Sequence, residues 1–284
     1  MNQSSARGES YFLAQVVPLL LTVVIFGLLT LGLLGQILLL NRFTAVDIIR
    51  QIRWSDVLVG MTIYLKTAVD FAIFIGNLMS QFPGWKNRVS IEIGTALGNA
   101  AGTMIVLTIW NFFRNVEWLL AIMIFIAALV LFRLAEDGLE HARAGDSKSS
   151  SWFYIMVEYF SKILYRINVV SHIFLRFIIP NISMKADKKN LTFWGLFSFS
   201  FTVPFVLGLD DFAGYVPLFN VVNVFGFAIG VFAGHMVLNA LLFISPDRTI
   251  KAVKNPLIAF LGSIAFVLLA VWGLVEVYKI LFVH

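Results

Sequence analysis

The sequence predicts an all-α, polytopic membrane protein with about seven transmembrane helices. Sixty per cent of its 284 residues are apolar and only 13% are charged, whereas a soluble domain carries roughly 25% charged residues. Mean hydropathy is +0.88, and apolar runs of roughly twenty residues, long enough to cross a bilayer, recur along the chain.

The apolar runs delimit the expected spans. In order they are 11–40, 54–80, 89–113, 116–135, 192–213, 219–244 and 256–282. The first run is too long for the apolar region of a signal peptide and lacks a clear cleavage site, so we expect a retained span. The chain has no cysteine, which excludes disulfides and thiolate metal sites.

Lysine and arginine distribute unevenly between the predicted loops. The N-terminal segment, the 81–88 loop, the central linker and the 245–255 loop hold most of them. Because basic residues favour the cytoplasmic side, we expect a multi-pass protein of the plasma (inner) membrane, with its N-terminus inside and its C-terminus outside. The net charge of +5 is therefore attributed to topology, and no nucleic-acid partner is expected.

An eleven-residue pattern occurs twice. Residues 94–104 read GTALGNAAGTM and residues 226–236 read GFAIGVFAGHM, and an Asp-Phe-Ala step precedes each copy, at Asp70 and at Asp211. This indicates an internal duplication. Because each unit would contain three spans, the two units would be inverted in the membrane, as in many transporters.

The duplication sets the expected organisation. An extra N-terminal helix and loop (1–53) precede the first repeat (54–135), a cytoplasmic linker (136–191) follows, and the second repeat (192–284) ends the chain. The linker begins with a polar stretch, 136–151, that favours a mobile loop. Within residues 152–179, Glu158, Lys162 and Arg166 lie four positions apart. This spacing favours an interfacial amphipathic helix, with an eighth span as the alternative.

The repeated glycines are interpreted as packing positions. Residues four apart share one helix face, so each copy forms a groove in which two backbones can approach closely. These helix-packing glycines are Gly94, Gly98, Gly102, Gly226, Gly230 and Gly234.

Three aspartates carry the candidate chemistry: Asp70, Asp210 and Asp211 lie within or near apolar runs. A carboxylate in hydrocarbon costs roughly 2.5–3.5 kcal/mol even on insertion scales, so such a residue normally faces a cavity, an ion or a partner. Two alternatives remain open: Asp70 could pair with Lys66 one turn earlier, and Asp210 could cap a helix break after Gly208.

A polar stripe accompanies the glycines. Asn99 and Thr103 share a face in the first copy, while His235, which matches Thr103, lies in the second. Together with Asp70 and Asp211 as metal ligands, these side chains would form a site for a hard or borderline cation. Interhelical hydrogen bonding is the alternative role.

The two copies resemble the lysine-exporter superfamily, and within it the cadmium-resistance type of membrane transporter. The resemblance rests on Thr67-Ala68-Val69-Asp70-Phe71, on the helix from Ile93 to Met104, and on Gly208-Leu209-Asp210-Asp211-Phe212. It implies two inverted three-span repeats, helices broken near paired midplane acids, and export of cations or amino acids. The chain departs from that pattern at Lys66, whose counterpart is Leu207, and in its extra first span.

The sequence thus favours a secondary transporter that exports a cation by alternating access, with a divalent metal ion as one candidate. Export of an amino acid or similar small solute, and a non-transporting scaffold or accessory subunit, remain alternatives. No catalytic motif is present, so neither enzyme activity nor a cofactor is expected. The bilayer and a small cation or amino-acid-like substrate are the expected partners, and a homo-oligomer is left open.

Overall fold

Helices account for all the regular structure that is described. A computed structural model describes residues 16–44, 47–144, 151–175, 192–220 and 222–283, and these contain no strand. The all-α prediction is therefore confirmed for this part of the chain. The helices are α1 (Val17–Leu40), α2 (Trp54–Thr67), α3 (Val69–Gln81), α4 (Trp85–Phe113), α5 (Glu117–Ala144), α6 (Ser151–Leu175), α7 (Phe193–Gly214), η3 (Val216–Asn220), α8 (Val224–Ile244), α9 (Pro246–Val253) and α10 (Pro256–Phe282).

Five described helices are long and apolar enough to cross a membrane: α1, α4, α8, α10 and the 117–140 part of α5. The pair α2 and α3, bent by 66° at its break, would make a sixth. Large apolar side chains lie exposed on these helices, as Val23 (69%) and Leu268 (65%) do. Such surfaces suit lipid, so the helices indicate a membrane-embedded protein. The finer count of seven spans stays a prediction, because the apolar part of α7 within the described side chains is the short 193–206 stretch.

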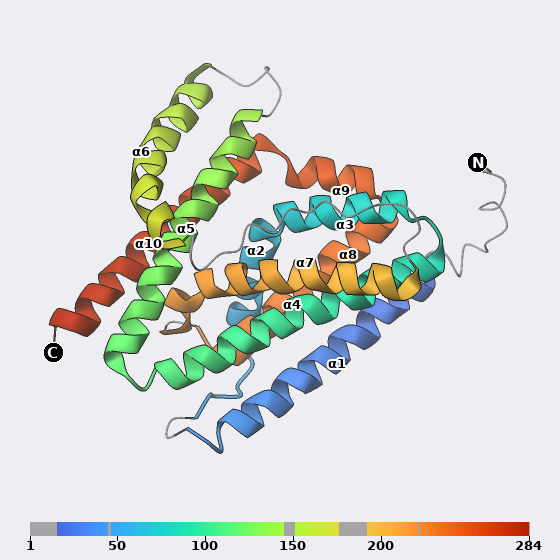
Figure 1. Ribbon diagram of the computed structural model, residues 1–284, viewed down its shortest axis with the longest axis horizontal. Helices are drawn as coiled ribbons and strands as arrows, with labels where there is room; N and C mark the ends of the chain where they lie inside the picture. The colour runs from blue at the N-terminus through green and yellow to red at the C-terminus, as the bar shows by residue number, and fades with distance from the viewer. Residues whose placement is uncertain (1–15, 45–46, 145–150, 176–191, 221, 284) are drawn as a thin grey trace.

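Two pairs of helices cross at glycines. Helix α2 packs on α8, and α7 packs on α4 (Figure 1). A Cβ atom at Gly230 would overlap the carbonyl oxygen of Val57, and one at Gly98 would overlap that of Phe201. Only glycine permits such close backbone contact at these points, which agrees with the packing role expected from the sequence.

The remaining glycines of the two copies are less constrained or less fully described. A Cβ at Gly94 would lie 2.7 Å from the carbonyl oxygen of Phe197, and one at Gly234 would lie 2.9 Å from Tyr64 Cδ1. At Gly226 the nearest atom, Asp56 Cβ, would be 3.3 Å away, which is a milder contact. Gly102 is buried on the same helix as Gly94.

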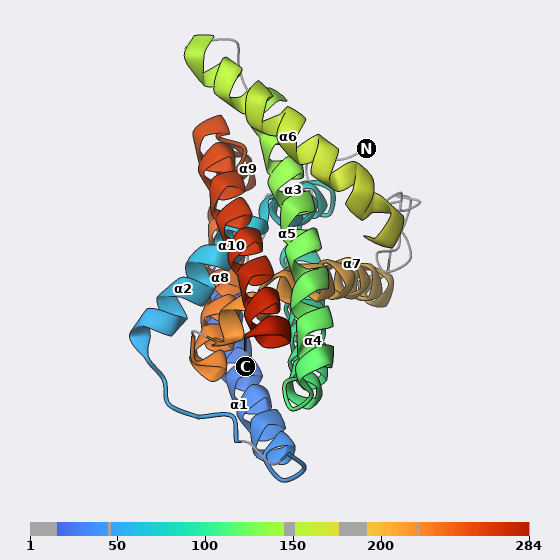
Figure 2. The same ribbon diagram turned by 90° about the vertical axis from the view of Figure 1, so that its left-hand side faces the viewer.

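The other long helices surround this centre. Helices α5 and α10 pack on each other, with α6 on the outer side of α5 (Figure 2). Helix α1 lies along α4 and α8 at the opposite side of the molecule (Figure 1). The short α9 packs against α3 and α8.

Two local expectations from the sequence are wrong. The polar stretch that begins at Glu136 is not a loop up to residue 144, because α5 continues through Ala144. Tertiary contact explains this: Leu139 is buried, and Asn168 of α6 donates a hydrogen bond to Glu136 Oε2 at 2.5 Å. Helix α7 likewise does not break after Gly208 but continues to Gly214, so Asp210 does not cap a break there.

The linker prediction is tested only in part. A helix does occupy 151–175, and Glu158 and Lys162 form an exposed ion pair at 2.8 Å on its surface. Residues 145–150 and 176–191, which include Arg176, Pro180 and Lys185 to Lys189, lie outside the described residues.

Candidate functional site

A chain of buried hydrogen bonds links α2 to α8. The hydroxyl of Tyr64 lies 2.8 Å from His235 Nδ1, and Asn239 Nδ2 lies 3.2 Å from His235 Nε2. All three side chains are almost fully buried, and the ring of Phe71 packs 5.1 Å from the imidazole. In the neutral ring, Asn239 donates to Nε2, so Nδ1 carries the proton and donates to the Tyr64 oxygen.

The local sequence explains why these groups meet. His235 and Asn239 are one helical turn apart on α8 and share a face. Gly234 and Gly230 on α8 let α2 approach closely, and this brings Tyr64 against the imidazole. The described contacts of His235 therefore fit its alternative role, a hydrogen bond between helices.

A second hydrogen bond joins the break between α2 and α3 to the end of α7. Thr67 Oγ1 lies 2.6 Å from the hydroxyl of Tyr215 and also donates to the Tyr64 carbonyl oxygen at 3.0 Å. Thr67 is the last residue of α2, where the 66° break begins. Tyr215 follows the end of α7 and precedes η3, and its side chain is fully buried. The first helices of the two sequence copies are thus connected where α2 breaks and where α7 ends.

The three aspartates lie along the backbone close to the α2–α3 break and to the end of α7. Asp70 is in the first turn of α3, one turn after Thr67. Asp210 and Asp211 are in the last turn or so of α7, just before Tyr215. Their side chains lie outside the part of the structure that is described, so the expected meeting of the carboxylates stays a prediction.

The polar positions on α4 are buried but take no part in the network. Asn99 is 4% exposed and Thr103 is 1% exposed. The hydroxyl of Thr103 has no hydrogen-bond partner among the described residues. Within that part of the chain, His235 therefore bonds to Tyr64 and Asn239 and not to its expected neighbours on α4.

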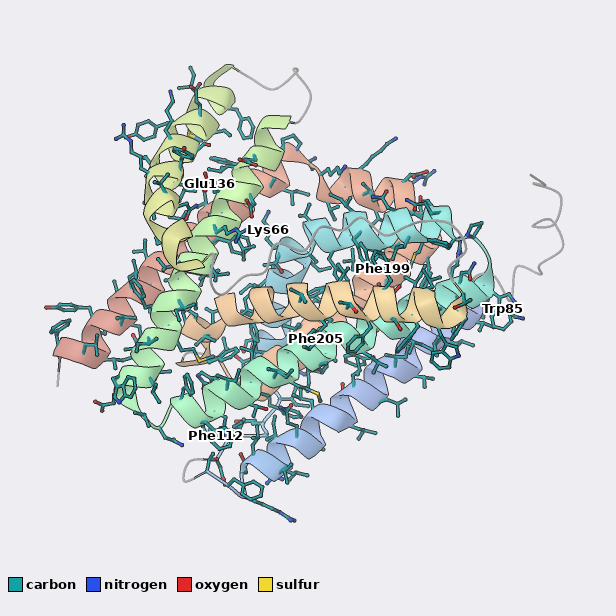
Figure 3. The ribbon with its side chains drawn as sticks, viewed as in Figure 1. Lys66, Trp85, Phe112, Glu136, Phe199 and Phe205 are labelled. Carbon is teal, nitrogen blue, oxygen red and sulfur yellow. The ribbon has the colours of Figure 1, made fainter. Side chains whose placement is uncertain are left out.

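Lys66 points away from the helix crossing, from the end of α2 towards α5 and α10 (Figure 3). Its side chain lies against Gly262, where a Cβ atom would overlap the lysine Cε. Within the described residues, Lys66 makes no ion pair. Its pairing with Asp70 stays untested, since that carboxylate is outside the described side chains.

Glu92 is a buried acid that sequence reasoning missed. Its side chain is 0% exposed, Thr22 of α1 donates a hydrogen bond to its Oε1, and Oε2 has no partner among the described residues. Glu92 stands two residues before Gly94 inside an apolar run. The rule that singled out Asp70, an acid within a span, would have found it.

Tyr64 and Tyr215 were also missed. A tyrosine in an apolar run reads as a packing residue, but a buried hydroxyl requires a hydrogen-bond partner. That requirement is the signal that would have pointed to a polar partner on another helix.

The described residues contain no group of three or more His, Asp or Glu side chains that could hold a metal ion. Three hydroxyls, an imidazole and an amide instead form the described polar centre. Hydroxyl oxygens are hard ligands that could complete a cation site together with carboxylates, but not replace them. No protein-family model, no curated protein and no solved structure matches this chain.

Proposed function

We propose that the chain is a secondary transporter that moves a small cation across the membrane, with Asp70 and Asp211 as the ion or proton site. The observation that carries this proposal is the Thr67–Tyr215 hydrogen bond at 2.6 Å. It joins the break between α2 and α3 to the end of α7, and each of these points is within about one helical turn of one of the two aspartates. Transporters place substrate and coupling ions at discontinuous helices of this kind, as α2 and α3 are.

The direction of packing supports inverted repeats. Gly226, Gly230 and Gly234 contact α2 at successively later residues, so α2 and α8 run parallel. Gly94 and Gly98 contact α7 in the same sense, so α4 and α7 also run parallel. The first helix of each unit thus packs along the glycine helix of the other unit, which is the exchange expected if a two-fold axis relates them.

The glycine crossings supply a route for alternating access. Backbone-to-backbone contacts carry few interlocking side chains, so one unit can rock against the other with little repacking. The buried Tyr64–His235 hydrogen bond joins the two units at one of these crossings, so it would have to rearrange during that motion. Export is the direction implied by the resemblance to resistance-type transporters.

Flux through the purified full-length protein in proteoliposomes tests the proposal. A divalent-metal panel and an amino-acid panel should separate cation transport from transport of organic solutes. Asp70→Asn and Asp211→Asn should each abolish flux, because each removes a charge that the ion requires. Glu117→Gln, an exposed acid at the start of α5, is the matched control and should leave flux unchanged.

Tyr215→Phe probes the described contact directly, because it removes only the hydroxyl that meets Thr67. We expect reduced flux with the folded state retained, as judged by the melting temperature. Full transport by both aspartate variants would sink the site assignment. Absence of flux for every member of both panels would favour the scaffold or accessory-subunit alternative.

A further inference from the structure

A cavity of about 530 Å³ lies where α2 breaks into α3, and α8, α9 and α10 complete its wall. This volume falls within the roughly 300–1,000 Å³ of small-molecule sites. Most of its described lining is aliphatic, for example Val69, Leu238 and Val253. The cavity is separate from the Tyr64–His235 network, which faces the α2–α8 crossing.

Two cations line this aliphatic cavity. They are Lys66 at the end of α2 and Arg248 on α9, and no acidic side chain is among the described lining residues. Neither cation forms an ion pair with a described residue. Two hydroxyl residues, Ser245 and Thr249, also line the wall, and the Thr249 hydroxyl shares its proton between the carbonyl oxygens of Leu241 and Ser245 at 3.0 and 2.9 Å. The two cations are thus the groups in this wall that an anion would satisfy.

The wall opens onto a surface suited to acyl chains. Leu241, Ile244 and Ile258 line the cavity and are also 47%, 61% and 44% exposed. In a membrane, exposed aliphatic side chains on spanning helices face lipid tails. The occupant therefore needs an apolar portion that continues into the bilayer, which a small water-soluble anion lacks.

The basic helix α9 places this cavity near the headgroups. It carries Arg248 and Lys251 on an exposed surface and packs on α3 and α8. The charge distribution of the loops puts α9 on the cytoplasmic side, where anionic lipids concentrate. An amphipathic helix of this kind typically lies at the membrane surface with its basic side towards the headgroups.

We propose that this cavity binds one anionic phospholipid of the cytoplasmic leaflet. Its phosphate lies between Lys66 and Arg248, and an acyl chain lies along Leu241, Ile244 and Ile258. Gly262 permits the lysine to adopt this position, because a Cβ there would occupy the space of the Lys66 side chain. The lipid phosphate would lie beside the lysine at the end of α2 and would hold α9 against the broken helix α2–α3.

Native mass spectrometry of the detergent-purified full-length protein tests this site. Dioleoyl phosphatidylglycerol and dioleoyl phosphatidylcholine are titrated separately, and bound lipid is counted. The wild type should prefer phosphatidylglycerol. Arg248→Gln and Lys66→Gln should each weaken phosphatidylglycerol binding about five-fold and leave phosphatidylcholine binding unchanged, as expected for one phosphate-facing cation.

Lys251→Gln is the matched control, because it removes an exposed cation from α9 that does not line the cavity. It should leave the preference intact. Arg248 is exposed, so Arg248→Gln is expected to fold even if Lys66→Gln does not. A third variant, Ala252→Phe, fills the cavity from α9 and should lower the occupancy of both lipids.

Competition with soluble anions shows whether the cavity binds a phospholipid or a free anion. Octanoate and inorganic phosphate should not displace phosphatidylglycerol at equal concentration. Displacement by octanoate would overturn the lipid assignment in favour of a soluble organic anion. Equal binding of the two phospholipids by the wild type, or an equal loss in Lys251→Gln and Arg248→Gln, would also overturn it. Each of these readouts is independent of whether the protein transports a cation.

Discussion

A carboxyl group buried between α1 and α4 shows how single residues hold the extra N-terminal helix. The Thr22 hydroxyl lies within hydrogen-bond distance of Glu92 Oε1 and of the Pro18 carbonyl oxygen, between which it shares its proton, and no other described residue bonds to the carboxyl side chain. Further towards the C-terminal end of α1, Gln36 donates to the Met104 carbonyl oxygen at 2.7 Å. Lipid-embedded helices gain little from apolar contact with each other, so such polar bonds decide where α1 attaches.

Thr22→Val should destabilise the protein, because it removes the described hydrogen bond to a buried carboxyl group while preserving side-chain shape. We expect a loss of about 1–2 kcal/mol in the free energy of unfolding, seen as a lower melting temperature in micelles. Thr30→Val on the same helix is the control, since the Thr30 hydroxyl is buried without a described partner. Removing the Thr30 hydroxyl should leave the free energy of unfolding unchanged or slightly higher. Equal losses of stability in Thr22→Val and Thr30→Val would contradict the role given to Thr22.

At the scale of the helix, the glycine crossings are the main feature of helix packing. A Cβ at Gly230 would overlap the Val57 carbonyl oxygen and lie 2.9 Å from the Met61 nitrogen. Gly60, on the facing helix, meets the Phe227 backbone in the same way. Both helices therefore present glycine at one crossing, and the backbone atoms on either side cannot move aside as a flexible side chain could.

Gly230→Ala should therefore separate α2 from α8. The expected cost is about 1–3 kcal/mol of unfolding free energy, the usual range for an overpacked core. Gly27→Ala on α1, where nothing lies within 4 Å of the added Cβ, is the matched control. It should be neutral or stabilising by up to about 1 kcal/mol, since alanine favours the helix. A melting temperature lowered equally by both substitutions would contradict the crossing as the cause.

At the scale of the whole molecule, periodicity and hydropathy predicted the long helices and the glycine contacts well. Both depend on local pattern, and α4 and α8 follow it closely. The continuation of α5 to Ala144 could not be predicted, because it depends on burial of Leu139 and on Asn168 from α6. In the candidate site, His235 was anticipated and Asn239 shares its face one turn later on the same helix, but the partner Tyr64 required knowledge of which helices cross.

The topology of the whole chain can be tested by labelling. The protein contains no cysteine, so an introduced cysteine is the one thiol of the chain that a maleimide can label. Ser55, at the start of α2, and Thr192, just before α7, are both exposed. Inverted repeats place the starts of these two helices on opposite sides of the membrane. With the N-terminus inside, a membrane-impermeant maleimide applied to intact cells should label Ser55→Cys and should label Thr192→Cys only after permeabilisation. Asn115→Cys and Lys251→Cys, in the predicted outer and inner loops, calibrate the two sides. Labelling of Ser55→Cys and Thr192→Cys from the same side would refute the inverted arrangement, and with it the alternating-access mechanism that depends on it.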